Sequence, residues 1–130
     1  SSSEPQIITV KVGSKTSNHP YPAGGSSSSS AYFLNGLESP AIRFSGADSS
    51  GKYYYKFDIS DSSNSGHPLR FSITQNGTHG GGSEYTTGVT TNGTPGSSGA
   101  YTQITVASGA PTLYYYCTNH SGMGWIANTV

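Results

Sequence analysis

Lys52-Tyr-Tyr-Tyr-Lys-Phe-Asp58 is the stretch that decides the fold class of this chain. Tyr53, Tyr55 and Phe57 fall on one face and the residues between them on the other, which is the two-residue period of a β-strand. Tyrosine and phenylalanine also favour strands. No segment of the 130 residues has a helical period of useful length, so the sequence predicts an all-β protein.

Similar short runs recur along the chain and are separated by Gly, Ser, Thr, Asn and Pro. Strands are expected at 6–12, 32–34, 40–44, 52–58, 69–74, 101–106 and 112–117, with shorter ones at 85–89 and 125–127. Asn35-Gly36 predicts a tight turn between the strands at 32–34 and 40–44, because both residues tolerate positive φ. About eight strands at this spacing predict a Greek-key β-sandwich.

Length and composition indicate one domain. A chain of 130 residues fits a single modest core, and ten Tyr, four Phe and one Trp supply enough buriable surface to offset the entropy of ordering. We expect residues 1–30 to form an extended strand followed by a flexible loop, since the serines from Ser26 to Ser30 have little to bury. Residues 31–130 are expected to form the sandwich.

The chain carries little charge. Six basic and six acidic side chains give a net charge of +0 without the basic stripe that binds phosphates, so nucleic acid is not an expected partner. No apolar run is long enough to span a bilayer. The low charge and the many Ser, Thr, Gly and Tyr residues are typical of an extracellular, periplasmic or particle-surface setting.

The densest chemical signal is Tyr116-Cys-Thr-Asn-His-Ser-Gly-Met123, at the end of a predicted strand. Its thiol, imidazole and thioether belong to Cys117, His120 and Met123. A second imidazole is supplied by His67, which lies just before another predicted strand. A thiolate and two imidazoles with a weak axial thioether form a site that holds copper and transfers one electron. The sequence therefore predicts a mononuclear copper site, set against the alternative that a lone Cys in a β domain is a small core residue.

These residues resemble the cupredoxin family. The Cys-x-x-His-x-x-Met spacing is similar to the short ligand loop of amicyanin, and the His-Pro pair at His67 is similar to the copper-binding His-Pro of multicopper oxidases. The resemblance implies a cupredoxin-like sandwich and the following ligands: equatorial imidazoles from His67 and His120, the thiolate of Cys117 and the axial thioether of Met123.

The chain departs from small cupredoxins directly after the first ligand. Those proteins commonly have Asn there, whose backbone and side chain help to fix the ligand loop near the sulfur. This chain has Pro68, which has no backbone donor. Asn64 and Asn119 are the candidate substitutes.

Over nearly its whole length the chain also resembles repeated cupredoxin-like modules of marine bacterial surface proteins and phage virion proteins. The similar segments are 63–71, 88–93 and 113–124. This resemblance implies a structural building block of an extracellular or virion assembly, such as a capsid decoration, fibre or surface appendage, that associates with itself or with other structural subunits. The alternative is a soluble, periplasmic blue-copper electron carrier with a redox partner.

Catalysis is not expected. The sequence has no Ser-His-Asp set in a nucleophile-elbow context, no phosphate-cradling loop and no carboxylate pair. A copper site closed by four protein ligands also has no open position for a substrate. A carbohydrate-binding sandwich would use the tyrosines and Trp125, but the sequence has no ligand-specific pattern for it.

Several other polar residues have simpler interpretations. His19 and His79 lie among Gly and Pro and are expected to be exposed loop residues that bind no metal. Asp58, Asp61 and Asn64 are expected to form turns, since they lack the spacing of a calcium loop.

Three N-glycosylation patterns begin at Asn76, Asn92 and Asn119. Short patterns of this kind arise by chance in a chain rich in Ser and Thr. The third overlaps the predicted copper site and is not expected to be modified.

Overall fold

The computed structural model describes residues 6–21, 24, 27–44, 52–107 and 110–129. Within these residues the chain forms two mixed β-sheets and two short 3-10 helices, which confirms the predicted all-β sandwich. No helix in this part of the chain has the length and apolar character needed to cross a membrane. The elements are β1 (Gln6–Ser14), β2 (Ser30–Leu34), β3 (Leu37–Glu38), β4 (Ile42–Phe44), β5 (Lys52–Asp58), η1 (Ser62–Asn64), β6 (Leu69–Ser72), η2 (Gly77–Gly80), β7 (Val89–Asn92), β8 (Tyr101–Ala107), β9 (Leu113–Cys117) and β10 (Ile126–Thr129).

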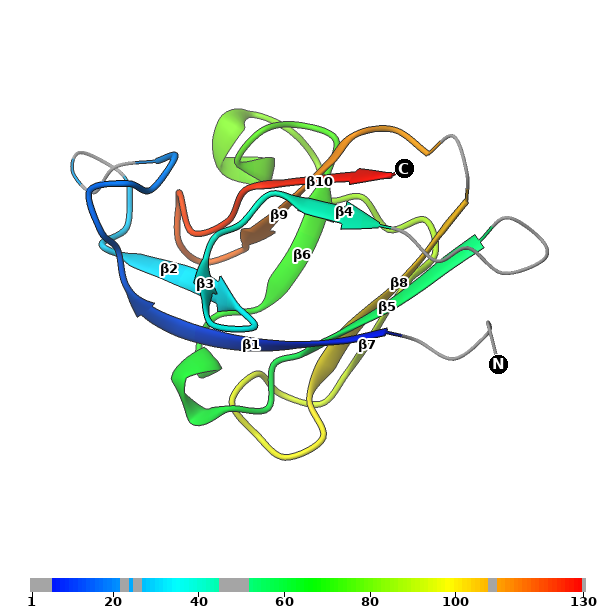
Figure 1. The fold of residues 1–130 in the computed structure, drawn as a ribbon, viewed down its shortest axis with the longest axis horizontal. Helices are drawn as coiled ribbons and strands as arrows, with labels where there is room; N and C mark the ends of the chain where they lie inside the picture. The colour runs from blue at the N-terminus through cyan, green and yellow to red at the C-terminus, as the bar shows by residue number, and fades with distance from the viewer. Residues whose placement is uncertain (1–5, 22–23, 25–26, 45–51, 108–109, 130) are drawn as a thin grey trace.

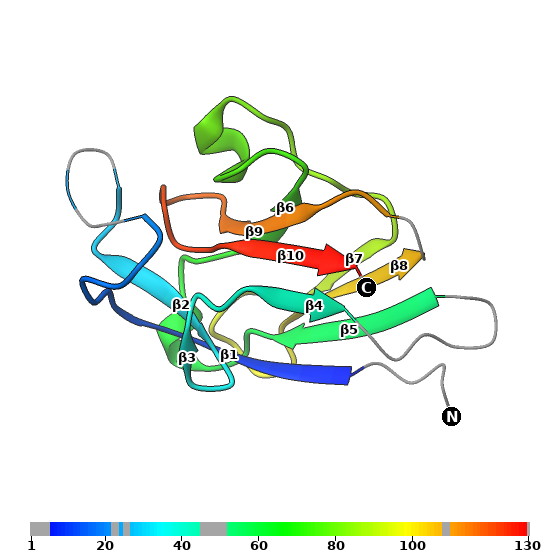
Figure 2. The same ribbon diagram turned by 45° about the horizontal axis from the view of Figure 1, so that its top comes forward.

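The strands divide into two layers (Figure 1). One sheet has the order β3-β2-β1-β5-β8-β7, and the other has the order β4-β10-β9-β6. Figure 2 shows β4, β9 and β10 above β1 and β5 after a turn of 45°. Among the described strands, β1 pairs with β5 and β4 with β10 in parallel, and the other pairs are antiparallel. Greek-key connectivity and membership of the cupredoxin family stay predictions.

Aromatic side chains from both sheets meet in the core. Tyr53, Tyr55 and Phe57 of β5 are buried, as their alternation predicted. Phe57 packs edge to face on Phe71 of β6 with ring centroids 5.3 Å apart, and Tyr55 packs on Phe44 of β4 at 4.8 Å. Both contacts cross from one sheet to the other. Burial of each such side chain contributes about 1.5–3 kcal/mol, so these pairs hold the two layers together.

The turn at Asn35-Gly36 forms, but its return strand differs from the prediction. The two turn residues have φ values of 50° and 86°, and the chain returns as β3, whose Leu37 and Glu38 pair with β2. Ser39 then takes a positive φ of 33° and the chain changes direction. β4 crosses to the other sheet, where it pairs with β10. A local turn signal indicated the hairpin but could not indicate where its second strand ends.

Two later strands are displaced from their expected positions. The strand expected at 85–89 is wrong, because β7 begins at Val89 and Tyr85 makes an isolated bridge with Phe71. The last strand starts at Ile126 and ends at Thr129, against the expected 125–127. Both segments are short and polar, so pairing with β8 and β4 sets their limits more than their own alternation does.

The serines before β2 contact the far end of the chain. Ser27 forms a bridge with Ser121, and the N–H of Ser28 donates to the carbonyl oxygen of Ser121 over 2.8 Å. These contacts use backbone groups, which is why the serine composition did not indicate them. Residues 1–5 and Ser26, which belong to the expected N-terminal extension and flexible loop, lie outside the described residues.

Candidate metal centre

Strand pairing brings two of the predicted ligands together. β6 and β9 are antiparallel with Leu69 opposite Cys117, so the residues just before β6 lie beside those just after β9. The N–H of Thr118 donates to the carbonyl oxygen of Pro68 over 3.3 Å and extends this ladder by one step. His67 therefore lies beside Cys117, although 50 positions separate them in the chain.

A tight turn after β9 adds the third ligand. Cys117 and His120 form an antiparallel bridge across two intervening residues, so the imidazole folds back toward the thiol. Gly122 follows with a φ of 81°, a conformation that glycine adopts without strain, and the chain turns toward β10. The short Cys-x-x-His-x-x-Met spacing thus corresponds to two successive turns of the chain.

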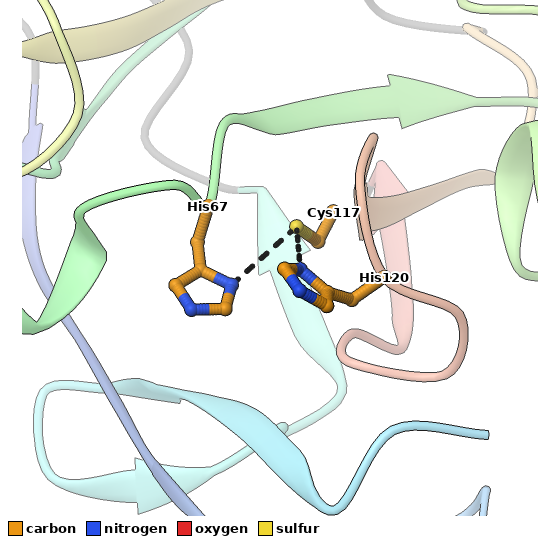
Figure 3. A group of neighbouring side chains, drawn as sticks. All are labelled: His67, Cys117 and His120. Atoms are coloured by element: carbon orange, nitrogen blue, oxygen red, sulfur yellow. Dashed lines mark hydrogen bonds between the residues drawn. The ribbon is translucent and has the colours of Figure 1, made fainter.

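The three donor atoms converge on one point at the end of the sandwich (Figure 3). The Sγ atom of Cys117 lies 3.5 Å from Nδ1 of His120 and 3.7 Å from Nδ1 of His67. The two imidazole rings have centroids 4.5 Å apart and are tilted by 37°. One possible ligand atom from each of the three residues lies within 4.8 Å of the others. A search of the described residues for His, Cys, Asp and Glu side chains that are close enough to hold a metal ion finds this group.

These separations suit a metal. With bonds of about 2.0–2.3 Å to nitrogen and sulfur, a single ion holds its donors about 3.3–3.8 Å apart, and the two sulfur–nitrogen distances lie in this range. Sulfur is a weak hydrogen-bond partner, so contacts of this length contribute little on their own. The donor set of one thiol and two imidazoles matches soft and borderline metals, copper and zinc among them.

Burial sets the protonation of the site. Burial raises the pKa of the Cys117 thiol, and hydrogen bonding to the sulfur from the backbone N–H groups of Asn119 and His120 opposes this effect. Burial, together with the nearby His120, lowers the pKa of His67. The cluster therefore favours a neutral thiol beside a neutral imidazole at pH 7. A bound metal would displace the thiol proton.

The segment that carries His67 is anchored through its backbone. The hydroxyl of Tyr32, a buried residue of β2 in the opposite sheet, donates to the carbonyl oxygen of His67 over 2.8 Å. The N–H of His67 donates to the carbonyl oxygen of Asn64 at 2.8 Å. The side-chain amide of Asn119 donates to the carbonyl oxygen of Gly66 over 3.0 Å and ties the two ligand segments to each other. The side chain of Asn119 thus supports the segment that carries His67, whereas Asn64 contributes only its backbone carbonyl there and its side-chain amide donates to the carbonyl oxygens of Val10 and Asp61.

Met123 is buried and has a fixed backbone. Its side chain belongs to the hydrophobic core, and its carbonyl oxygen accepts from the N–H of Tyr32 over 2.9 Å and from the hydroxyl of Ser39 over 2.8 Å. This backbone is therefore held from the opposite sheet, through two neighbouring segments. The role of Met123 as axial ligand stays a prediction.

His19 is not the exposed loop residue that the sequence suggested. It is 3% exposed. Its Nδ1 accepts from the N–H of Tyr21 over 2.9 Å, so in the neutral ring Nε2 carries the proton and donates to Ser39 Oγ over 2.8 Å. Because that imidazole nitrogen is a donor, it cannot act as a base toward the Ser39 hydroxyl, and the pair is structural.

His79 is exposed, as expected, but its ring makes a hydrogen bond. Its Nε2 lies 2.8 Å from the carbonyl oxygen of Cys117, which can only accept, so this nitrogen carries the proton. Sequence reasoning missed this contact and the role of Tyr32. No local signal could have indicated either, since both partners are distant in the chain.

The remaining polar residues fit simple roles. Asp58 accepts from Ser60, and Asp61 caps η1 by accepting from Ser63, which are turn contacts and not a calcium site. Trp125 contacts Tyr21 and Tyr114 edge to face, at interplanar angles of 81° and 67°, so these rings do not make the flat platform on which a sugar ring stacks.

Comparisons with known proteins find no relative of this chain. No protein-family model matches it, and no curated protein and no solved structure matches it. The functional argument therefore rests on the geometry of the site and on the physical character of the surface.

Proposed function

We propose that His67, Cys117, His120 and the axial Met123 bind one copper ion, and that the domain is a structural building block of an extracellular or virion assembly. One observation carries the copper proposal: the two imidazoles and the thiol bring ligand atoms within 4.8 Å of one another at the end of two paired strands. A thiolate with two imidazoles is the equatorial set of a type-1 copper site.

The metal would act as a staple in this role. It would link the segment just before β6 to the end of β9, where the hydrogen-bonded pairing of these two strands ends. A metal that binds the folded state stabilises it by mass action. Such a staple suits a domain with a small core and few charges, which must persist outside the cell.

Surface features support the assembly role. Ile7, Leu37 and Ile73 are exposed by 60% or more, and the first two lie on the six-stranded sheet. That sheet ends in β7, whose residues Thr90, Thr91 and Asn92 are exposed. Exposed strand edges and apolar side chains are the usual means by which β-sandwich subunits pair with neighbours.

The copper proposal is tested by adding copper(II) or zinc(II) to the purified metal-free domain. We expect one copper per chain and an intense thiolate-to-copper band near about 600 nm, which Cys117→Ser abolishes. Zinc alone bound, without a copper band, would replace copper by a structural zinc site. No bound metal would overturn the proposal and leave the fold unaffected.

The assembly proposal is tested by light scattering over a range of protein concentration. We expect oligomers that grow with concentration and that Leu37→Lys weakens, whether or not copper is present. A chain that stays monomeric at all concentrations would contradict the building-block role.

The alternative is an electron carrier, and it has one favouring observation. Cys117 is buried, whereas both imidazoles of the cluster reach solvent. A solvent-accessible ligand ring is a path for an electron to a docked partner. A monomer with reversible one-electron chemistry at the copper band would favour this alternative over the assembly role.

A further inference from the structure

Asn76 contacts the ligand loop, which we define as Cys117–Met123, with both ends of its side-chain amide. Its Nδ2 donates to the hydroxyl of Ser121 over 2.9 Å, and its Oδ1 accepts from the N–H of Gly122 over 2.8 Å. Asn76 has a left-handed backbone, with φ 63° and ψ 15°, immediately before η2. These bonds span 45 and 46 positions in the chain, so they join the turn after β6 to the loop after β9.

The turn that carries Asn76 fits closely against the end of β9. Gly77 lies over the ring of Tyr116, where a Cβ atom would come within 2.5 Å of the ring carbons. His79, two residues later, donates to the carbonyl oxygen of Cys117 over 2.8 Å. Three successive contacts therefore place the turn against the strand end and the loop.

The ligand loop depends on such contacts because strand pairing does not reach its centre. The β6–β9 ladder ends with the bond from Thr118 to Pro68, and the backbone is next held at Ser121, whose carbonyl oxygen accepts from the N–H of Ser28, and then at Met123. His120 lies between Thr118 and Ser121. The segment just after that histidine is held on the backbone by Ser28, which donates to the carbonyl oxygen of Ser121, and by the side chain of Asn76, which contacts the Ser121 hydroxyl and the N–H of Gly122.

We propose that Asn76 is a positioning residue that fixes the ligand loop with His120 facing Cys117 before any metal arrives. The consequence for copper rests on the proposed function, whereas the ordering of the loop does not. The proposal also assigns a role to the pattern Asn76-Gly-Thr78: because the amide nitrogen is engaged with Ser121, glycosylation there would require the loop to be released.

Asn76→Gly and Asn76→Asp separate the side chain from the backbone. Glycine keeps the left-handed conformation and removes both hydrogen bonds. Aspartate tolerates the same backbone conformation, accepts from the N–H of Gly122 and also accepts from the hydroxyl of Ser121. It should therefore restore both contacts with the ligand loop. Asn35→Gly is the matched control, because Asn35 also has a positive φ, 50°, and its Oδ1 accepts from a backbone N–H, that of Thr9.

The first measurements use the metal-free protein. In Asn76→Gly we expect the amide hydrogen of Gly122 to exchange at least about tenfold faster, and the buried thiol of Cys117 to react faster with a thiol reagent by a similar factor. Asn76→Asp should return both rates to within about threefold of wild type. Asn35→Gly should leave both unchanged while exposing the amide of Thr9.

The second measurement is the copper affinity of the same four proteins. We expect a loss of about tenfold or more in Asn76→Gly, with recovery in Asn76→Asp. Unchanged Gly122 exchange and Cys117 reactivity in Asn76→Gly would overturn the positioning role, whatever the copper result. Wild-type protein that binds no copper, while Asn76→Gly still loosens the loop, would overturn the copper part of the proposed function and support the positioning role.

Discussion

The histidines of this molecule have two kinds of environment, which differ in what the ring nitrogens contact. His19 is buried, and each of its nitrogens has a partner with matching donor and acceptor character, Tyr21 and Ser39. His67 and His120 instead direct Nδ1 toward the sulfur of Cys117, at distances too long for strong hydrogen bonds. The first ring has its lone pair in use, and the other two have lone pairs available to a metal.

The comparison shows that residue type and burial do not identify a ligand. His19 is more buried than either ring of the cluster and makes better hydrogen bonds, yet it offers no free acceptor. Its network, through the Ser39 hydroxyl, reaches the carbonyl oxygen of Met123. It therefore supports the ligand loop as structure and does not bind metal.

The largest expected effect comes from removing a ring of the cluster. His67→Ala should lower copper affinity by more than about 100-fold, since even supporting residues of metal sites cost 10–100-fold. The measurement is a competition titration against a copper chelator. His19→Gln is the control, with a change below about tenfold. Equal losses of copper affinity in both variants would contradict the distinction between metal-binding and structural histidines.

Removing the structural ring should instead act on stability. His19→Ala leaves the N–H of Tyr21 without its acceptor, removes the donor to Ser39 Oγ and opens a cavity, which should cost about 2–4 kcal/mol of the free energy of unfolding. Urea unfolding of the metal-free protein measures this loss. A variant as stable as wild type would show that the buried network is dispensable.

The Ser39 hydroxyl should contribute less. Ser39→Ala removes the acceptor of His19 and the donor to Met123, with an expected loss of about 1–2 kcal/mol in the same unfolding assay. Because Ser39 has a φ of 33°, Ser39→Gly separates the hydroxyl from backbone strain. The glycine variant should be no less stable than the alanine variant. The reverse order would mean that backbone strain at this position is negligible.

The smallest effect is a pH dependence. Burial, followed by the nearby Lys15, lowers the pKa of His19 from its ordinary value of 6.5. Below pH 6.5 the unfolded chain binds a proton that the folded chain does not, so stability present at pH 7.5 is lost as pH falls toward the folded pKa. His67 acts in the same direction, so the measured quantity is the difference between wild type and His19→Gln. The variant should lose less stability between about pH 7.5 and pH 5. An equal loss would contradict a depressed pKa at His19.

Much of the fold could be predicted because its signals are local. The alternation in β5 identified which side chains are buried, and Asn35-Gly36 identified a turn, since both depend on a few neighbouring residues. The path after that turn could not be predicted. Whether the chain returns as β3 for two residues or as a longer strand depends on the pairing of β4 with β10, which is remote in sequence.

The candidate site likewise has a part that local sequence predicted and a part that it could not predict. Cys117 and His120 are close because they are three residues apart, and the turn between them brings their ligand atoms together. The environment of His19 could not be predicted, since its partner Ser39 lies 20 positions away and reaches it only through the fold. In the sequence Asn76 is notable only as the start of a glycosylation pattern, although it contacts the ligand loop.

By itself the sequence determined the β class, the buried faces of the long strands and the short donor spacing after Cys117. The sequence also predicted His67 as the second imidazole, but only the tertiary structure places it beside that thiol, with Nδ1 3.7 Å from Sγ of Cys117. The register that places Leu69 opposite Cys117 brings His67 to the thiol, whereas His19 is buried with Tyr21 and Ser39 as partners and His79 bonds to the carbonyl oxygen of Cys117. The physical reason is range: alternation and turns depend on the conformational preferences of adjacent residues, whereas strand register depends on which pairing buries the whole core.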